Sequence, residues 1–508
     1  MRVLHVIPSL SPKEGGPSFA VKAMAEALAR EGVQVTIATT GQEETTRQRD
    51  HETAESRESE SVVAAVSAAK HAARVPPQGP SKQGEGSKGS EAGSWEGDGY
   101  RVVCFRRNFE SYKISFGLTR WLRENVAKFD LVHIHALFSF SSTVAARIAR
   151  RQNVPYLVRP LGVLNQWGMQ NRRRVPKLIS FRLVELPVLI NSAAIHYTSE
   201  AERKEAALLD ARLAEHESAI IPLPVEQGAR STASGSESAT ARREQGEASK
   251  EPFFAQFPEA QGKRIILFLS RIDRKKGLEL LLDAFAMVRA ENQEVALVIA
   301  GDGEESYLRE LKEHAKRDRE TTRLQDNVTT GQRVYEATGQ QDRGPVVSGQ
   351  LSGGLSSDVI WTGHLRGEMK AAALVGADVF VLPSASENFG IAAAESLAAG
   401  VPTIVSEEVA LSSDIRQYDA GVVVKRDVQQ LARAMSDLLS NKQKATTLAA
   451  NGHRLVEERY SPKAVGKALH ELYQRIIRKR DKGRDARLLD YRTTRQRDWN
   501  EDGIARTK

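Results

Sequence analysis

The sequence predicts an α/β protein with two doubly wound parallel sheets, and three observations lead to that fold class. Short apolar runs alternate with helical patterns, as at 3–7, 18–30 and 33–39, which is typical of parallel strands joined by helices. A second series of this kind begins with an apolar run at 263–269. The chain has 508 residues, which is long enough for two or three domains with separate cores.

Polar stretches without helical or strand periodicity divide the chain. The first, 42–99, is dominated by Glu, Ser, Arg, Gly and Gln, and such a composition cannot bury enough apolar surface to fold. We predict a first domain at 1–225 with this stretch as a disordered insertion, a flexible linker at 226–251, a second domain at 252–460 with a flexible insertion at 317–357, and a charged tail at 481–508.

Composition narrows the class of partner without identifying it. The net charge of +8 would suit nucleic acid, anionic lipid or a phosphorylated substrate. No aromatic-rich nucleic-acid module is visible, so we expect no nucleic-acid partner. The single cysteine, Cys104, excludes an intrachain disulfide and suits a reducing cytosol. No run approaches the roughly 18 apolar residues of a spanning helix, so we expect a cytoplasmic protein.

The stretch with the most chemical content begins after the apolar run 377–382, which predicts a buried strand, and continues into helical spacing at 389–399. Glu387 lies in the loop between them and Glu395 about two turns into the helix, so both carboxylates could face one ligand. On spacing alone, an unrelated pair of acids is an equally good interpretation. The N–H groups that begin the helix would favour an anion; they belong to Asn388, Phe389 and Gly390.

Three further features stand where strands of a doubly wound sheet would end, which is where its ligands bind. Gly15 and Gly16 precede the first helix and would let the backbone approach a phosphate, although a plain tight turn is the commoner explanation. His133 and His135 end the run 131–135. We expect their side chains to point in different directions, with His133 in the packing and His135 at the edge of the crevice.

Basic residues gather in two places. Arg271 and Lys276 flank a loop after the run 263–269, where a planar guanidinium and a compact ammonium could together neutralise a diphosphate. A second group, Arg172, Arg173 and Arg174, precedes an apolar-faced helical pattern at 178–189 and could contact anionic lipid. For each group, an ordinary solvated surface is the competing interpretation.

The context of the two glutamates resembles the retaining glycosyltransferases of family 4, whose members carry Glu, seven residues and Glu inside a Pro-Ser-x-x-Glu-x-Phe-Gly word. The matching positions are Pro383, Ser384, Glu387, Phe389, Gly390, Glu395, Ala399, Gly400 and Pro402. This resemblance implies a GT-B fold, in which two Rossmann-like domains face each other across a cleft. It also implies that a helix at 461–480 packs back on the first domain.

The resemblance implies a role for each candidate residue. Glu387 would hold hydroxyls of the donor sugar, Glu395 the ribose, and His135 would lie beside the sugar. The donor diphosphate would be bound by Arg271, Lys276, Gly15 and Gly16, with Asn388, Phe389 and Gly390 at the helix start, Gly301 at the donor edge, and His364 and Leu365 by the base. Arg159 stands in an Arg-Pro order where many members have Pro-Arg.

The resemblance therefore implies a retaining glycosyltransferase that moves a sugar from a UDP- or GDP-linked donor to a sugar or lipid-linked acceptor, in cell-surface polysaccharide or glycolipid assembly. We expect no cofactor and no metal, since no Asp-x-Asp motif ends a strand. Peripheral contact with an anionic membrane at its inner face would fit such an acceptor. A GT-B nucleotide-sugar epimerase and a noncatalytic nucleotide-sugar-binding protein are the alternatives.

Overall fold

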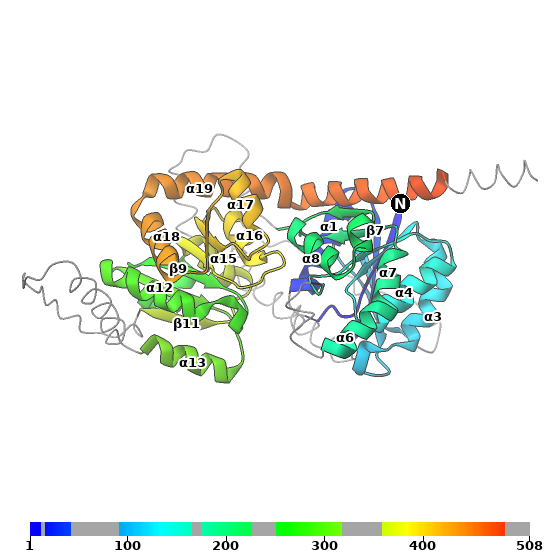
Figure 1. Cartoon of the computed structure of the whole chain (residues 1–508), viewed down its shortest axis with the longest axis horizontal. Helices are drawn as coiled ribbons and strands as arrows, with labels where there is room; N and C mark the ends of the chain where they lie inside the picture. The colour runs from blue at the N-terminus through cyan, green and yellow to red at the C-terminus, as the bar shows by residue number, and fades with distance from the viewer. Residues whose placement is uncertain (12–15, 42–90, 165–173, 226–249, 317–357, 483–508) are drawn as a thin grey trace, which may run out of the picture. The chain divides into compact units, whose positions relative to one another are not determined.

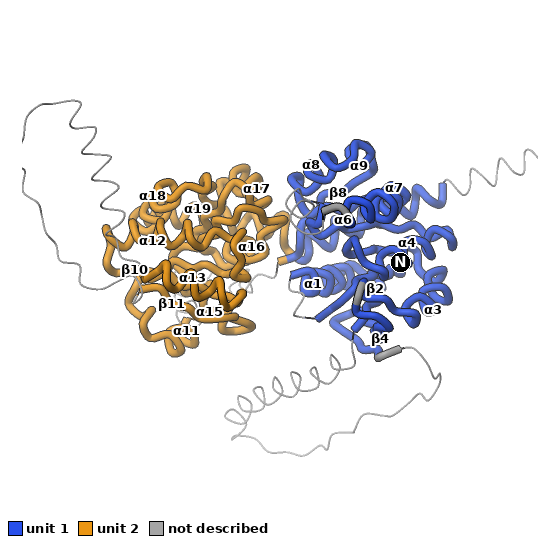
Figure 2. The backbone as a smooth tube through the Cα atoms, turned by 60° about the horizontal axis from the view of Figure 1, so that its bottom comes forward, with its two compact units in different colours: residues 1–224, 462–508 blue, residues 225–461 orange. Residues whose placement is uncertain are grey.

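The protein is described by a computed structural model, which shows residues 1–11, 16–41, 91–164, 174–225, 250–316 and 358–482. Gly15, Arg172, Arg173 and most of the predicted insertions, linker and tail lie outside the described residues. The chain divides into two compact units (Figure 2). Unit 1 comprises Met1–Pro224 together with Pro462–Lys508, and unit 2 comprises Val225–Ser461.

Unit 1 is built on an eight-stranded sheet with the strand order β3-β4-β2-β1-β5-β6-β7-β8. Its strands are β1 (Arg2–Ile7), β2 (Gln34–Gly41), β3 (Glu91–Glu96), β4 (Tyr100–Arg106), β5 (Leu131–His135), β6 (Tyr156–Arg159), β7 (Ala194–Tyr197) and β8 (Ser218–Ile220). From β4 to β8 all neighbours are parallel. The strand order reverses between β1 and β5, so the carboxyl ends of these two strands flank the position where ligands bind in such sheets.

Strand β3 pairs antiparallel with β4 at the sheet edge. It lies within the stretch 42–99, so the prediction of disorder is wrong for the last part of that stretch. Its residues include Gly93 and Trp95 among polar neighbours, and composition alone gave no strand signal. The pairing uses backbone hydrogen bonds, which any residue except proline can supply, so a polar edge strand escapes a test based on apolar content.

Helices pack on the unit 1 sheet (Figure 1), and alternate residues of its strands point to opposite faces. On one face Val6, Ile134 and Val158 pack with helices α3 (Phe116–Asn125), α4 (Phe140–Arg151) and α7 (Leu186–Ile190). The opposite face lies under α1 (Gly16–Arg30) and a helix at 462–482. The backbones of this last helix and α1 approach each other closely at Gly466, where any side chain would collide with the backbone of Ala27.

Unit 2 contains a six-stranded, fully parallel sheet with the order β11-β10-β9-β12-β13-β14. The strands are β9 (Arg264–Leu269), β10 (Val295–Ala300), β11 (Val359–Gly363), β12 (Val379–Leu382), β13 (Thr403–Ser406) and β14 (Val422–Val424). The reversal in strand order falls between β9 and β12. Helix α11 (Glu251–Gln256) begins at the last residue of the predicted linker. In the part of the chain that the structure describes, no helix is both long and apolar enough to cross a membrane.

Candidate functional site

A buried lysine and a glutamate form an ion pair where the strand order of unit 2 reverses. Lys276 ends a short 3-10 helix, η7 (Arg274–Lys276), that follows β9, and Glu387 lies in the loop that follows β12. The Lys276 ammonium contacts Oε2 of Glu387. Lys276 is only 5% exposed, so its positive charge is held in a region from which most water is excluded, where electrostatic interactions are strong.

Backbone contacts explain why these two loops meet. Gly277 has a φ of 72°, and a side chain there would collide with the carbonyl oxygen of Pro383. The Ala385 N–H donates to the carbonyl of Lys275 at 2.6 Å. Only a residue without a Cβ fits this close approach, and its left-handed conformation also favours glycine. The glycine that follows Lys276 therefore lets the basic loop lie directly on the loop that carries Glu387.

Glu387 is itself fixed by the loop after β13. Its N–H donates to the carbonyl of Glu408 at 3.2 Å, and its carbonyl accepts from the N–H of Ala410 at 3.0 Å. Two backbone hydrogen bonds thus hold the residue while its carboxylate reaches Lys276. The sequence motif identified Glu387 but gave no indication of this support, because the partner loop lies about 20 positions away along the chain.

The basic loop concentrates positive charge at this edge. Burial, and then the neighbouring ammonium of Lys276, lower the pKa of Lys275. Arg271 is exposed and has no hydrogen-bond or ion-pair partner among the residues that the structure shows. Arg274 points elsewhere: its guanidinium pairs with Glu310 at 2.6 Å on α13 (Glu305–Lys316). One cation of the loop is therefore paired with an acid at the sheet edge, and another is available to an anion.

The second predicted acid, Glu395, lies on α16 (Ile391–Ala398). The helix begins two residues later than the sequence predicted, because Gly390 adopts a φ of 90° and serves as its N-cap. Oε1 of Glu395 accepts a hydrogen bond from Lys370 at 2.6 Å, and Lys370 lies on α15 (Gly367–Gly376). Lys370 was not singled out in the sequence, since nothing in its local pattern connects it with an acid 25 residues away.

The remaining unit 2 candidates end the neighbouring strands. A side chain at Gly301, after β10, would collide with the carbonyl of Ser270, so this glycine lets the loops after β10 and β9 touch. His364 and Leu365 follow β11; the imidazole of His364 is exposed and Leu365 is buried. The carboxyl ends of four adjacent strands thus carry the predicted donor-site residues of this unit. The side chain of Phe389 is buried, and its ring packs on the ring of Tyr460, so this side chain contributes to the core of unit 2.

In unit 1, the prediction that His133 and His135 point in different directions is wrong. Their ring centroids lie 4.1 Å apart, because residues two apart on a strand share a face. Both are fully buried, and Nε2 of His135 lies 3.2 Å from Nδ1 of His5 on β1. Gly16, the other described candidate of this unit, is the first residue of α1.

Arg159 ends β6 and is almost fully buried. Burial lowers its pKa to about 10, an effect that the charge of Glu202 opposes. Its side chain has no ion-pair partner among the described residues, and the only hydrogen bond described for that side chain runs from Nη1 to the sulfur of Met24 at 3.8 Å. Ser199 caps α8 (Glu200–Leu209) by accepting from the N–H of Glu202 at 3.1 Å.

A second group of unusual residues in unit 1 gave no sequence signal. Glu185 is fully buried at the end of a π-helical turn, η4 (Phe181–Glu185), and burial raises the pKa of its carboxyl to about 6. The Tyr112 hydroxyl donates to Glu185 at 3.5 Å. Tyr112 and Phe138 have φ values of 65° and 54°. Such backbone strain in residues other than glycine is concentrated at functional sites.

Large apolar side chains are exposed beside this group. They come from two segments that the Tyr112–Glu185 contact joins: the loop and helix start after β4, and the segment from α6 (Arg174–Ser180) into η4. We call these residues the apolar patch: Phe109, Phe116, Leu178, Ile179 and Leu183. Lys177 and Arg182 lie within the second segment, which contains no acid between Arg174 and Val184. An apolar surface of this kind marks contact with a protein or a membrane.

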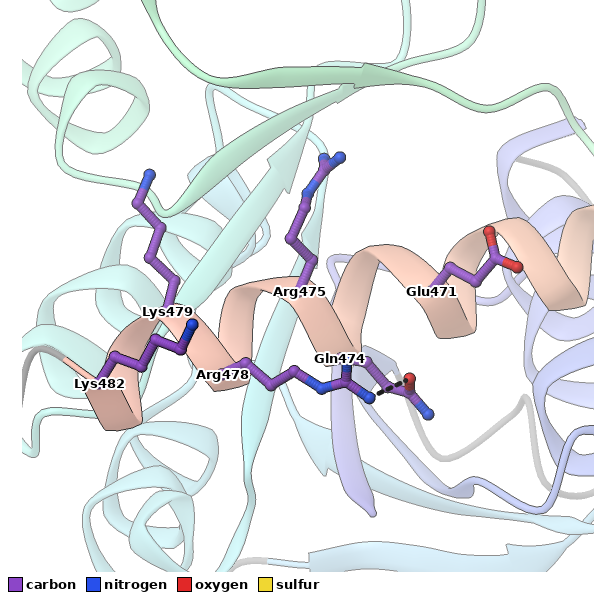
Figure 3. A pocket seen from close by; sticks show the side chains of 6 residues that line it. All are labelled: Glu471, Gln474, Arg475, Arg478, Lys479 and Lys482. Carbon is purple, nitrogen blue, oxygen red and sulfur yellow. Dashed lines mark hydrogen bonds between the residues drawn. The ribbon is translucent and has the colours of Figure 1, made fainter.

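A shallow hollow runs along the helix at 462–482 (Figure 3). Six long side chains of that one helix line it: Glu471, Gln474, Arg475, Arg478, Lys479 and Lys482. Two of them pair with Glu217, Lys479 at 2.8 Å and Arg475 at 3.6 Å. Because a single helix face forms this hollow from exposed, flexible side chains, it has none of the convergent polar groups of a binding site.

The chain resembles known glycosyltransferases in sequence and in structure. Residues 249–336 and 348–455 match the family described as glycosyl transferases group 1, and residues 15–219 match the glycosyl transferase 4-like domain. The α-monoglucosyldiacylglycerol synthase of Streptococcus pneumoniae is 31% identical over 214 residues, which are 42% of this chain and 39% of that protein. The phosphatidyl-myo-inositol mannosyltransferase of Mycobacterium leprae is 28% identical over 216 residues, 42% of this chain and 47% of that protein.

The chain thus spans less than half of the length of each of these two curated relatives. A crystal structure of Anabaena HepE in complex with UDP and glucose is 13% identical, with a TM-score of 0.60 over 93% of this chain and 99% of that one. This structural likeness shows the GT-B fold. Since the two family matches together cover most of the chain, one in each half, the protein belongs to the group 1 glycosyltransferases of family 4 with the GT-B fold.

Proposed function

We propose that the protein transfers a sugar from a UDP- or GDP-linked donor to a sugar or lipid-linked acceptor, with retention at the anomeric carbon. The Lys276–Glu387 ion pair at the carboxyl edge of the unit 2 sheet carries this proposal. A buried cation and a carboxylate side by side suit a reaction in which an anionic diphosphate leaves a sugar that becomes cation-like. Family membership and the match of the surrounding motif support the same assignment.

In this mechanism the leaving diphosphate is stabilised by charges that are already in place. Lys276 and Arg271 would neutralise it, a preorganised electrostatic effect that often is the largest single contribution to catalysis. These two cations would do the work of a metal ion, so we propose a metal-independent reaction that uses no cofactor. Glu387 would bind donor hydroxyls and favour the developing positive charge. We assign no covalent nucleophile.

Glu395 would bind the donor ribose, and Lys370 would orient it. The contact between these two side chains leaves Oε2 of Glu395 able to accept from a second donor, because the described hydrogen bond uses Oε1. His364 and Leu365 would form the wall against the base, and Gly301 would lie at the donor edge. Gly16, with Gly15 before it, would approach the diphosphate from the start of α1, where the helix dipole favours an anion.

Calorimetric titration of UDP, GDP and ADP into the full chain tests the donor site. We expect one nucleotide to bind wild-type protein and to lose at least tenfold in affinity with the Arg271→Ala, Lys276→Ala double variant. Arg274→Ala is the matched control, because this arginine belongs to the same loop but pairs with Glu310. No binding of any nucleotide to folded wild-type protein would overturn the proposal.

Glu387→Gln separates a transferase from a noncatalytic binder. The variant removes the carboxylate that pairs with Lys276, and we expect it to retain nucleotide binding while transfer falls by about a hundredfold or more, the scale on which loss of one transition-state contact acts. Transfer at the wild-type rate would contradict the role of Glu387. Isomerised donor in the absence of any acceptor would instead favour an epimerase.

On the acceptor side, we propose that the apolar patch of unit 1 contacts an anionic membrane at its cytoplasmic face, where a lipid-linked acceptor would lie. Apolar side chains next to Lys177 and Arg182 are the combination that binds such a surface. The two curated relatives are by name a glucosyldiacylglycerol synthase and a phosphatidylinositol mannosyltransferase, which supports a glycolipid acceptor.

Flotation with vesicles of mixed neutral and anionic phospholipid tests this contact. Leu183→Asp should weaken vesicle binding and high salt should weaken it further. Leu208→Asp is a matched control, since Leu208 is 70% exposed on α8 and Leu183 71% exposed on η4. Equal binding by both variants would show that the apolar patch does not contact the membrane.

A further inference from the structure

A continuous chain of hydrogen bonds crosses the face of the unit 1 sheet that lies under α1 and the helix at 462–482. Four histidines and one tyrosine form it, and all five are fully buried. At one end, Nε2 of His196 lies 2.8 Å from the carbonyl oxygen of Ile221, and Nδ1 of His196 lies 3.2 Å from Nε2 of His133. The hydroxyl of Tyr473 then links two rings: it lies 2.7 Å from Nδ1 of His133 and 3.2 Å from Nε2 of His5. At the other end, Nδ1 of His5 lies 3.2 Å from Nε2 of His135.

The carbonyl at one end fixes the direction of every bond. A carbonyl can only accept, so His196 carries its proton on Nε2, and Nδ1 of a neutral His196 must accept from His133. Nδ1 of His133 then accepts the hydroxyl proton of Tyr473, whose oxygen accepts from Nε2 of His5. Nδ1 of His5 finally accepts from Nε2 of His135. Every imidazole is therefore the Nε2–H tautomer.

This arrangement requires that His5, His133 and His196 be neutral, because each uses both ring nitrogens in the chain of hydrogen bonds and a protonated ring would place two donors face to face. His135 uses only Nε2 in the chain, and its Nδ1 can accept a hydrogen bond only while the ring is neutral. Burial lowers the pKa of all four histidines, and the charge of Arg159 beside them lowers it further. Burial and the nearby cation thus favour the state that the hydrogen bonds require.

This chain of hydrogen bonds ends at His135, where the lone pair of Nδ1 is not used by any described residue. Nδ1 of His135 is buried and has no hydrogen-bond partner among the described residues. His135 is the last residue of β5, at the reversal in strand order where ligands of such sheets bind. Ala136 follows it with a φ of 99°. Backbone strain next to a buried polar atom without a hydrogen-bond partner is typical of a ligand-binding site.

We propose that Tyr473, on the helix at 462–482, is a positioning residue that holds His135 in the Nε2–H tautomer through His5, so that Nδ1 accepts a hydrogen bond from a hydroxyl of the bound sugar. This inference rests on the proposed function and on the position beside the donor sugar that the family resemblance implies for His135. It adds the atom that makes the contact, the direction of the bond, and a residue of the terminal helix on which the contact depends.

A metal ion is the competing use of this cluster, because ligand atoms of His5, His133 and His135 all lie within 4.8 Å of one another. Two observations disfavour it. The cation of Arg159 lies close enough to affect all three histidines, and their nitrogens, apart from Nδ1 of His135, already take part in the chain. A metal would have to displace most of these hydrogen bonds without an acidic ligand to offset the positive charge.

Solid-state NMR of the full chain with ¹⁵N-labelled histidine rings tests the tautomers without donor or acceptor. Single His→Gln variants assign the four rings among the 11 histidines of the chain. We expect a protonated Nε2 and a bare Nδ1 in each ring at neutral pH, and an altered Nδ1 signal at His135 alone when the donor binds. A protonated Nδ1 in any of the four, or stoichiometric binding of Zn²⁺ by the wild type, would overturn the proposal.

Tyr473→Phe tests the positioning role. It removes the acceptor of His5 and the donor of His133, so the tautomers of His5 and His135 should become mixed, and kcat should fall about tenfold, the equivalent of 1.4 kcal/mol, with little change in KM. Tyr197→Phe is the matched control, because Tyr197 is equally buried on the same sheet and its hydroxyl has no described partner. Unchanged His135 signals in a folded Tyr473→Phe variant would refute the role. An inactive enzyme with the expected tautomers would contradict only the proposed function.

Discussion

Acidification between pH 7 and pH 5 should destabilise unit 1 much more than unit 2. The groups responsible are the four buried histidines His5, His133, His135 and His196, which face one another, Tyr473 and Arg159. Burial, together with Arg159, lowers the pKa of His5 and His196 to about 3, from 6.5 in the unfolded chain. Below pH 6.5 the unfolded state therefore binds protons that the folded state does not, so stability falls as the pH falls.

The magnitude follows from the width of this window. Each unit of pKa difference is worth about 1.4 kcal/mol, so His5 and His196 should each remove about 2 kcal/mol between pH 6.5 and pH 5. Glu185 acts in the opposite direction, because its folded pKa of about 6 lies above the unfolded value; it regains roughly 1 kcal/mol over the same range. His133 and His135 shift in the same direction as His5. The net loss is thus a large part of the roughly 5–15 kcal/mol that stabilises a typical domain.

Differential scanning calorimetry of the full chain at several pH values measures this loss, with hydrogen exchange in β1 and β9 assigning each transition to a unit. The described histidines of unit 2, His314, His364 and His453, all reach solvent, so its transition should move little. His196→Gln should flatten the pH dependence of the unit 1 transition, and His314→Gln should leave it unchanged. A unit 1 transition that moves no further than that of unit 2 would refute the reasoning.

Three other substitutions test single contacts. Gly277→Ala should lower nucleotide affinity at least tenfold by calorimetry, because its Cβ would push the basic loop off Pro383; wild-type affinity would show that the loop contact is dispensable. Lys370→Ala should weaken nucleotide binding several-fold, because Glu395 loses its hydrogen bond from Lys370. If the variant lowered the transfer rate but left nucleotide affinity unchanged, the ribose role of Glu395 would be contradicted. Glu185→Gln should raise stability at pH 7 by up to about 2 kcal/mol in urea titration, since the variant has no carboxyl whose raised pKa opposes folding; a destabilised variant would mean that the carboxylate is paired.

The sequence predicted best what is encoded by neighbouring residues. The strands at 3–7 and 263–269 follow from apolar runs, and the loops that carry Lys276 and Glu387 follow from short motifs. What it missed depends on contacts between distant positions. The hydroxyl of Tyr473 meets His5 across 468 positions, and no local pattern marks either residue as a member of a chain of hydrogen bonds.

Other misses have a different physical origin. The π-helical turn that carries Glu185 has the same apolar spacing as an ordinary helix, so the pattern at 178–189 predicted the helix but gave no sign of the π-helical turn within it. The exposure of Leu183 was hidden for the same reason, because periodicity shows that a face is apolar and says nothing about what covers it. Only a description of the packing reveals that this face is uncovered.

The two units differ in the kind of polar group that they bury. This difference suggests that unit 2 stabilises charge in the proposed reaction and that unit 1 orients the sugar. Unit 2 places charges at its sheet edge, with Lys276 and Glu387 in contact and Arg271 nearby. Unit 1 buries neutral imidazoles beside Arg159, and a further positive charge there would break its hydrogen bonds. Charge is needed where a diphosphate departs, whereas directed neutral hydrogen bonds suffice to orient a sugar hydroxyl. We therefore expect salt to weaken the proposed nucleotide binding by unit 2 and to leave the proposed contact of His135 with the sugar almost unaffected.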